Sequence, residues 1–261
     1  MWSLPWLIRA ISDLPIPLYL RRRYSISKIR RSSGEGEGAM ASSHAHAVMQ
    51  PATRRRTLSV AGAAGIAMLP VFVGTVIVLT WLEWDFLHGT GWTVLHEHQV
   101  NYPSALARGN LGLLQSLNFL LLGGLALIFG RGLRTQFIHR WSGAIATIGL
   151  VAVGLSGLFS AFVTDLPDEP TSWHGILHGI GFVLLMLGSA VSFLAGGLAL
   201  RGAPDWRGYW IYSVLNTPLA IGVAFALSPI GQVSFYGLVI VLLAWFAVLG
   251  MRLRQIAART A

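Results

Sequence analysis

The sequence predicts an all-α membrane protein, a six-transmembrane-helix bundle with both termini in the cytoplasm. Of the 261 residues, 54% are hydrophobic and only 11% are charged, whereas soluble domains carry about 25% charged residues. The chain also contains six apolar runs of about the 20 residues that a helix needs to cross a bilayer. These runs are long and continuous, which favours helices over barrel strands, since the latter are about ten residues long and alternate in polarity.

The six predicted helices follow one another with short connections. Arginines or acidic residues separate the first five apolar runs from one another, and the short segment PIG, residues 229–231, separates the fifth from the sixth. The predicted spans are residues 60–83, 111–130, 143–164, 174–200, 209–228 and 232–251. Together they give a six-helix domain over residues 59–252, which a short cytoplasmic tail over residues 253–261 follows.

Residues 1–58 differ from the rest of the chain. They are basic, rich in serine and glycine and without sustained apolar periodicity, so they are predicted to form a disordered tail. The first 20 residues are apolar but contain three prolines, which makes them a poor spanning helix. A targeting peptide, or a true start at Met40 or Met49, is left open as an alternative.

The distribution of charge predicts the orientation. Arginines cluster before the first span, after the last, and in every second connection, while the other connections hold most of the acidic residues. By the positive-inside rule the arginine-rich ends are cytoplasmic. The net charge of +9 is therefore explained by arginines in cytoplasmic loops. Because these arginines do not form a nucleic-acid-binding face, no nucleic-acid partner is predicted. The expected partner is the lipid bilayer.

The polar stretch TDLPDEPTSWHGILHG, residues 164–179, is the main candidate site on the predicted outer side. His174 and His178 are four residues apart and share one helical face, a spacing that lets two imidazoles bind one metal ion such as zinc. Asp165 is a candidate third ligand, orienting carboxylate or general base. Because the chain contains no cysteine, thiolate catalysis and Cys-ligated metals are excluded.

The competing interpretation of these histidines is structural. They would form hydrogen bonds at the interfacial end of the helix, with Thr171 or Ser172 as its N-cap. Ser104 is a candidate catalytic serine on the predicted outer side. The candidate lining residues on the same side are Gln115, Asn118 and Thr171, and the outer loop adds two further histidines, His96 and His98.

Two segments resemble a known family. YPSALARGNLGLLQSLNFLLLGGL (residues 102–125) and GLSGLFSAFVTDLPDEPTSWHGILHG (residues 154–179) are similar to the bacterial membrane proteins grouped as domain of unknown function 998. The matching positions are Ser104, Leu106, Gln115, Asn118, Phe119, Asp165, Thr171, Gly175 and His178. The resemblance covers residues 60–251 and implies about six helices, but it supplies no activity and leaves the N-terminal tail unexplained.

A looser resemblance concerns the intramembrane hydrolases that include alkaline ceramidases and adiponectin receptors. Those proteins use a serine, an aspartate and an HxxxH pair around zinc, and Ser104, Asp165, His174 and His178 are the same residue types. They have seven helices and carry the pair in the last one, whereas this chain carries it in the fourth of six predicted helices. The resemblance implies a metal-dependent hydrolase of lipid-type substrates.

Three functions therefore stay open at the level of sequence. The first is a structural or ligand-binding protein with a polar pocket at its outer face, and the second is the metal-dependent hydrolase. The third is a small-solute transporter, against which the apolar centres of all six runs weigh, because carriers usually keep an ionisable residue at membrane depth.

Overall fold

A computed structural model of the chain describes residues 51–91, 102–166, 169–231 and 233–259. Within these ranges the secondary structure is helical, without a strand. Six helices are long and apolar enough to cross a membrane, namely α2 (Pro51–Leu82), α4 (Gly112–Arg134), α5 (Arg140–Ser160), α6 (Trp173–Leu200), α7 (Tyr209–Leu227) and α8 (Val233–Arg259). The predicted all-α bundle of six spanning helices is confirmed.

Short helical segments lie in the connections. They are α3 (Trp84–Gly89), η1 (Pro103–Arg108), η2 (Pro204–Trp206) and η3 (Ser228–Ile230). Of these, α3 and η1 lie between α2 and α4, so the longest connection of the bundle carries two of them. Each of the six predicted spans corresponds to one long helix, and the two differ only at their ends.

The largest differences are at the arginine-rich ends of the first and last spans. Helix α2 begins at Pro51, within the range predicted as a tail, and α8 continues to Arg259 through the predicted C-terminal tail. Arginine is a good helix former, and these extra turns are also packed, since Leu58 and Leu253 are fully buried. The rest of the predicted N-terminal tail, residues 1–50, lies outside the described residues.

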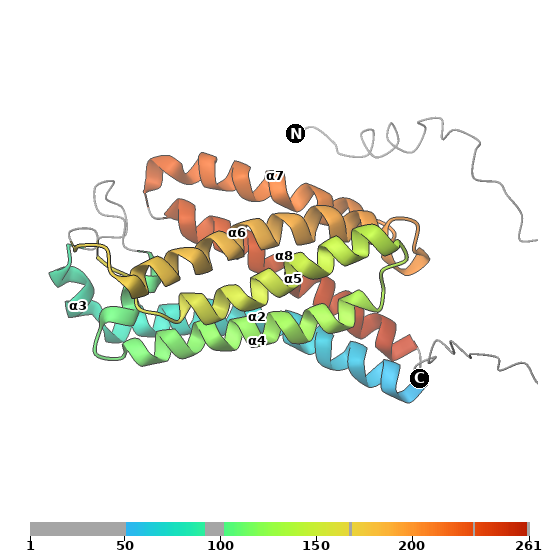
Figure 1. Cartoon of the computed structure of the whole chain (residues 1–261), viewed down its shortest axis with the longest axis horizontal. Helices are drawn as coiled ribbons and strands as arrows, with labels where there is room; N and C mark the ends of the chain where they lie inside the picture. The colour runs from blue at the N-terminus through green and yellow to red at the C-terminus, as the bar shows by residue number, and fades with distance from the viewer. Residues whose placement is uncertain (1–50, 92–101, 167–168, 232, 260–261) are drawn as a thin grey trace, which may run out of the picture. The chain divides into compact units, whose positions relative to one another are not determined.

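The six long helices close into a ring. Helix α5 packs against α4 and α6, α2 packs against α4 and α8, and α7 packs against α6 and α8 (Figure 1). Helix α7 has the smallest buried share of the six spans and runs along the edge of the bundle (Figure 1). We call the end that carries α3, η1 and the described residues 161–166 and 169–172 the outer end, following the predicted topology, and the opposite end the inner end.

Glycine allows α5 and α6 to approach closely. A Cβ atom on Gly149 would lie 2.6 Å from the Ser192 hydroxyl oxygen, and one on Gly188 would lie 2.9 Å from the Gly149 carbonyl oxygen. Small residues at such contacts are the usual means of packing helices in lipid, where backbones must come close to gain van der Waals contact. This tight seam fixes α6, which carries both candidate histidines, against α5.

Candidate functional site

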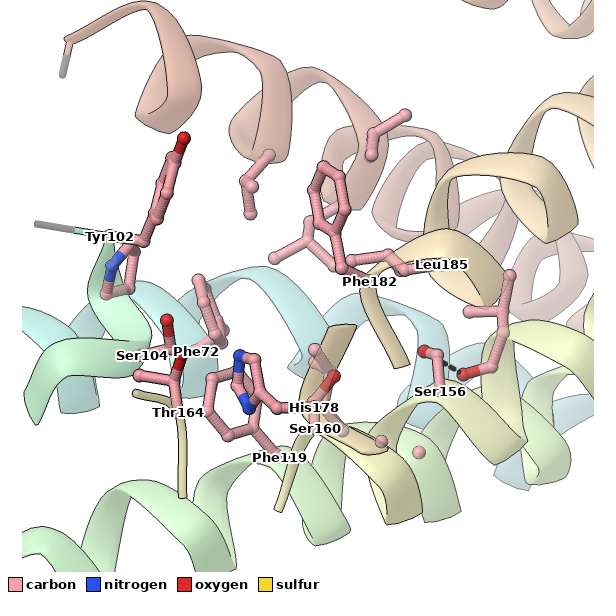
Figure 2. Close-up of a pocket in the computed structure, with 18 of the residues that line it drawn as sticks. Phe72, Tyr102, Ser104, Phe119, Ser156, Ser160, Thr164, His178, Phe182 and Leu185 are labelled. Carbon is pink, nitrogen blue, oxygen red and sulfur yellow. Dashed lines mark hydrogen bonds between the residues drawn. The ribbon is translucent and has the colours of Figure 1, made fainter. Parts of the chain in front are cut away.

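A cavity of about 330 Å³ lies inside the outer half of the bundle (Figure 2). Its walls come from α2, η1, α4, α5, α6 and α8 together with the segment after α5. The polar side chains that border it include Ser104, Ser160, Thr164 and His178, and the apolar ones include Met68, Val153, Leu185, Leu242 and Leu243. No charged side chain of the described residues borders it.

The polarity of the lining falls with depth. Helix α6 begins at Trp173 at the outer end, and a helix rises about 1.5 Å per residue, so His178 lies roughly 7 Å and Leu185 roughly 18 Å below that start. Ser160 and Thr164, at and after the end of α5, lie near the level of the histidine, whereas the aliphatic residues line the deep end. Ser156, one turn deeper on α5, also lines the cavity, but its hydroxyl group donates a 2.7 Å hydrogen bond to the Val153 carbonyl oxygen of its own helix. The cavity is therefore polar toward the membrane surface and apolar toward the membrane centre.

One side of the cavity borders the lipid-facing surface. Phe182 of α6 and Tyr102 before η1 both line the cavity and are 41% and 46% exposed. Both rings contact Phe235 of α8, at centroid distances of 6.0 Å and 4.8 Å. Helices α6 and α7 lie close together at the inner end and diverge toward the outer end (Figure 1). The cavity thus adjoins the exposed surface of the bundle where Phe182 and Tyr102 meet Phe235.

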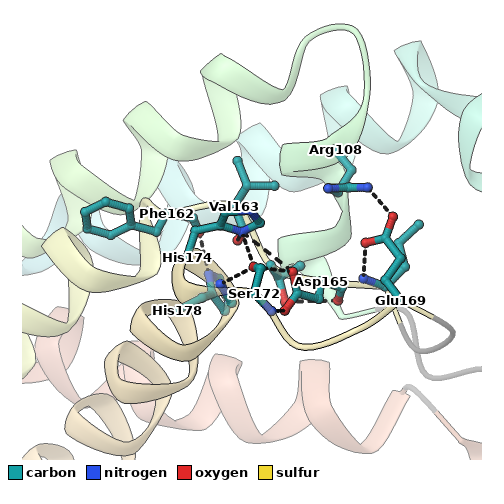
Figure 3. A network of polar contacts seen from close by, with 11 residues as sticks. Arg108, Phe162, Val163, Asp165, Glu169, Ser172, His174 and His178 are labelled. Carbon is teal, nitrogen blue, oxygen red and sulfur yellow. Dashed lines mark hydrogen bonds and ion pairs between the residues drawn. The ribbon is translucent and has the colours of Figure 1, made fainter.

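His174 and His178 bind the segment that follows α5 (Figure 3). Nδ1 of His178 lies 2.8 Å from the carbonyl oxygen of Phe162, and Nδ1 of His174 lies 3.0 Å from that of Val163. Carbonyl groups beyond a helix end lack helical partners, so two imidazoles one turn apart satisfy two consecutive carbonyls. The spacing of four residues thereby fastens the end of α5 to α6.

These contacts determine which ring nitrogen carries the proton. A carbonyl oxygen only accepts hydrogen bonds, so Nδ1 of each ring is the donor and a neutral ring keeps its lone pair on Nε2. His178 lines the cavity, whereas His174 does not. The Nε2 atom of His178 points away from Phe162, because the two ring nitrogens face in different directions, and it is available to a molecule in the cavity.

Asp165 anchors the start of α6 from outside the membrane spans. Its carboxylate accepts hydrogen bonds from the Ser172 N–H group (2.8 Å) and hydroxyl (2.6 Å). The Ser172 oxygen in turn accepts the Gly175 N–H group, so Ser172 rather than Thr171 is the N-cap. The hydrogen bond from the Ser172 hydroxyl, then that from its N–H group, holds the pKa of Asp165 below its ordinary value of 3.8.

The predicted zinc site has only part of its ligands in place. Within the described residues, no three His, Asp or Glu side chains gather where they could hold a metal ion. The Nδ1 atoms of His174 and His178 face carbonyl groups, which leaves Nε2 of each ring, whereas zinc sites use three or four protein ligands. The other candidates, His96 and His98, lie outside the described residues, and the zinc site stays a prediction.

The remaining predicted residues take different places. Ser104 borders the cavity, and Asn118 borders a shallower depression between α2 and α4. Gln115 is fully buried and accepts a 3.4 Å hydrogen bond from the Asn118 amide. Thr171 is exposed and borders neither space. Only Ser104 and His178 of the predicted set therefore come together at the cavity.

Glu83, the last residue of the first predicted span, is a buried acidic residue that was not among the candidate site residues. It is 4% exposed, and its carboxylate accepts a 2.5 Å hydrogen bond from the Leu111 N–H group at the start of α4. A negative charge is stabilised there by the helix dipole. Glu83 therefore ties the end of α2 to the start of α4 and fixes both ends of the connection that carries Ser104.

No family model, curated protein or solved structure matches the chain. The resemblance of residues 102–125 and 154–179 to domain of unknown function 998 therefore stays a prediction. The chemistry of the cavity, and of the side chains at its polar end, is what bears on function.

Proposed function

We propose that this multi-pass membrane protein binds a single-chain, lipid-type molecule in the cavity of its outer half, in a bacterial inner membrane. The observation that carries the proposal is the gradient of polarity, from Ser104, Thr164 and His178 at the outer end to Leu185 and Leu243 at the deep end. A lipid in the outer leaflet has the same gradient, with its head at the surface and its chain toward the membrane centre.

The size of the cavity supports a small ligand. Its volume of about 330 Å³ is at the lower end of the roughly 300–1,000 Å³ of ligand pockets. Empty space of this kind is costly in a folded protein, because the side chains around it lose van der Waals contacts. In a bilayer, a hydrocarbon chain restores those contacts at little cost, since the surrounding solvent consists of such chains.

The exposed edge of the cavity supplies a path for that chain. Gly179 and Phe182 line the cavity and are exposed on the side of α6 that faces lipid. Phe182 lies roughly 13 Å below the start of α6, from the rise of a helix, which is within the hydrocarbon region of the outer leaflet. A lipid therefore enters sideways from the bilayer between α6 and α8, without passing through water.

A substitution that fills the cavity tests the proposal. Four glycines line the cavity, and a Cβ atom on three of them, Gly123, Gly157 and Gly175, would meet other atoms at close range. A Cβ atom on Gly179 meets no other atom within 4 Å. Gly179→Leu is therefore expected to occupy the cavity without forcing helices apart.

Gly124→Leu is the matched control. Gly124 is an exposed helical glycine, its Cβ position is equally open, and it does not line the cavity. Mass spectrometry of lipids that remain bound after purification is expected to find one single-chain species with the wild type and the control, and to find it lost from Gly179→Leu. Equal lipid content in all three proteins would refute the proposal.

The metal-dependent hydrolase is the second candidate. One observation favours it, namely that Ser104 and His178 border the same cavity, so a hydroxyl group and a basic nitrogen would both face a bound lipid. It ranks below lipid binding because the described residues supply no third metal ligand.

A further inference from the structure

We propose that His178 recognises the head of the ligand, and that the ligand is a neutral single-chain lipid with a hydroxyl head group, of the monoacylglycerol type. This inference rests on the proposed function and adds the chemistry of the head group. In it, Nε2 of His178 accepts a hydrogen bond from a hydroxyl group of the lipid.

The first step of the argument is the fixed orientation of the ring. Nδ1 donates to the Phe162 carbonyl oxygen at 2.8 Å, and the ring meets the Phe119 ring edge-on at a centroid distance of 5.9 Å. Figure 2 shows the His178 ring beside Phe119, facing the cavity. The Ser160 backbone carbonyl group also lies within hydrogen-bonding reach of the ring. Since carbonyl groups only accept, both share the Nδ1 proton of the neutral ring, and Nε2 can only accept a hydrogen bond.

The second step concerns charge. The described residues that border the cavity include no Asp, Glu, Lys or Arg. A phosphate or carboxylate head group would lose its hydration there without gaining a partner of opposite charge, which is strongly unfavourable in an apolar site. The head group is therefore neutral.

The third step is complementarity of donors and acceptors. The hydroxyl groups of Ser104, Ser160 and Thr164 can both donate and accept, so they place no demand on the ligand. His178 is selective, because its Nε2 atom can only accept a hydrogen bond and therefore requires a donor group on the ligand. A hydroxyl group on the lipid meets that demand and also pairs with the serine and threonine hydroxyls, whereas an ether or a methyl ester does not donate.

His178→Asn separates the two ring nitrogens. Nδ1 of histidine and Nδ2 of asparagine are both bonded to Cγ, so the asparagine amide keeps a donor for the Phe162 carbonyl group while Nε2 is deleted. His174→Asn is the matched control, since it makes the same change one turn earlier on α6, keeps a donor for Val163, and lies outside the cavity lining.

The experiment is native mass spectrometry of the full-length protein in detergent with two probes. These are monododecanoylglycerol and its dimethyl ether, which share the chain and the ester but differ in hydroxyl donors. The wild type and His174→Asn are expected to bind monododecanoylglycerol roughly three- to tenfold more tightly, the effect of one hydrogen bond. His178→Asn is expected to bind both probes alike.

Each other outcome overturns a defined part of the proposal. If the wild type binds both probes equally, recognition of the head by His178 fails while lipid binding stands, and the wild-type comparison decides this even if a variant does not fold. If His178→Asn keeps the preference, the assignment to His178 fails. Tight binding of dodecyl phosphate would overturn the neutral head group, and binding of no probe at all would overturn the proposed function itself.

Discussion

The inner and outer halves of the bundle are packed in different ways. In the inner half, four fully buried aromatic residues, Phe129, Phe193, Trp245 and Phe246, contact one another. The Trp245 indole N–H group also donates a 3.0 Å hydrogen bond to Ser213. The outer half places small residues such as Gly157 and Ser160 toward its centre and keeps a cavity.

This difference assigns separate tasks to the two halves. Large interlocking rings leave little room for rearrangement, because interiors packed at crystal-like density respond to small changes in volume. Around the cavity, small residues such as Ser160 and Gly179 leave space that a ligand can fill. The inner half therefore holds the six helices together, and the outer half is free to bind.

Truncating an aromatic ring in each half gives the largest expected contrast. Trp245→Ala removes the residue at the centre of the inner cluster and is expected to cost about 3–5 kcal/mol of stability. Phe119→Ala removes a half-buried ring beside the existing cavity and is expected to cost clearly less, since it only enlarges a space that is already present. Both losses are measured by unfolding in the same detergent, followed by circular dichroism.

Trp245→Phe is the control for that comparison. It keeps an aromatic ring in the cluster and removes the hydrogen bond to Ser213, so it is expected to fall between the wild type and Trp245→Ala. Equal losses for Trp245→Ala and Phe119→Ala would show that the two halves contribute alike to stability and would remove the basis of the distinction.

The acid sensitivity of the outer end is the next contrast. The pKa of Asp165 lies lower in the folded protein than its ordinary value of 3.8. Its contribution to stability is therefore present above that value and is lost as the pH falls through the lowered pKa. Asp165→Asn, which has no such titration, is expected to lose this acid-dependent step while its helical content, followed by circular dichroism, stays unchanged at neutral pH.

Limited proteolysis of the connection between α5 and α6, followed from neutral pH into the acidic range below 3.8, measures that step. The wild-type segment is expected to be protected at neutral pH and to become accessible only in the acidic range, whereas the Asp165→Asn segment is expected to be accessible throughout. Equal protection of the wild type and Asp165→Asn at neutral pH would mean that the bonds from Ser172 to Asp165 do not hold the loop.

The fold was predictable because its determinants are local. A run of apolar residues bounded by arginines forms a spanning helix wherever its neighbours lie, and the ends of α6 and α7 agree with the predicted spans to within one residue. The first turns of α2 and the last turns of α8 were missed because packing stabilises them, as the buried Leu58 and Leu253 show, and apolar character alone does not.

The site was less predictable because it depends on how the helices meet. The spacing of His174 and His178 identified the pair, and His174 does lie beside the predicted Asp165 and Ser172, at 3.6 Å and 2.7 Å. However, both rings also contact backbone carbonyls, those of Val163 and Phe162, which no side-chain pattern reveals. Glu83 was missed because its partner, the Leu111 N–H group, is 28 residues away. The cavity itself arises from the faces of five spanning helices together with η1, and it has no signature in any one of them.

The smallest expected effect concerns the ion pair on the surface of the outer end. Arg108 of η1 pairs with Glu169 before α6 (Figure 3), and both side chains are about one-third exposed. Exposed pairs contribute about 0.2–1 kcal/mol, and salt screens them over a Debye length of about 10 Å at 0.1 M. Arg108→Ala is therefore expected to lower the melting temperature slightly at low salt and to match the wild type at high salt.

Lys in place of Arg108 is the control, since Arg108→Lys keeps the charge and is expected to behave as the wild type at both salt concentrations. A loss in Arg108→Ala that persists at high salt would mean that the arginine stem contributes packing between η1 and the loop before α6. In that case the outer end would be held by apolar contact, as the inner half is, and its ability to admit a lipid would have to come from the edge at Phe182 alone.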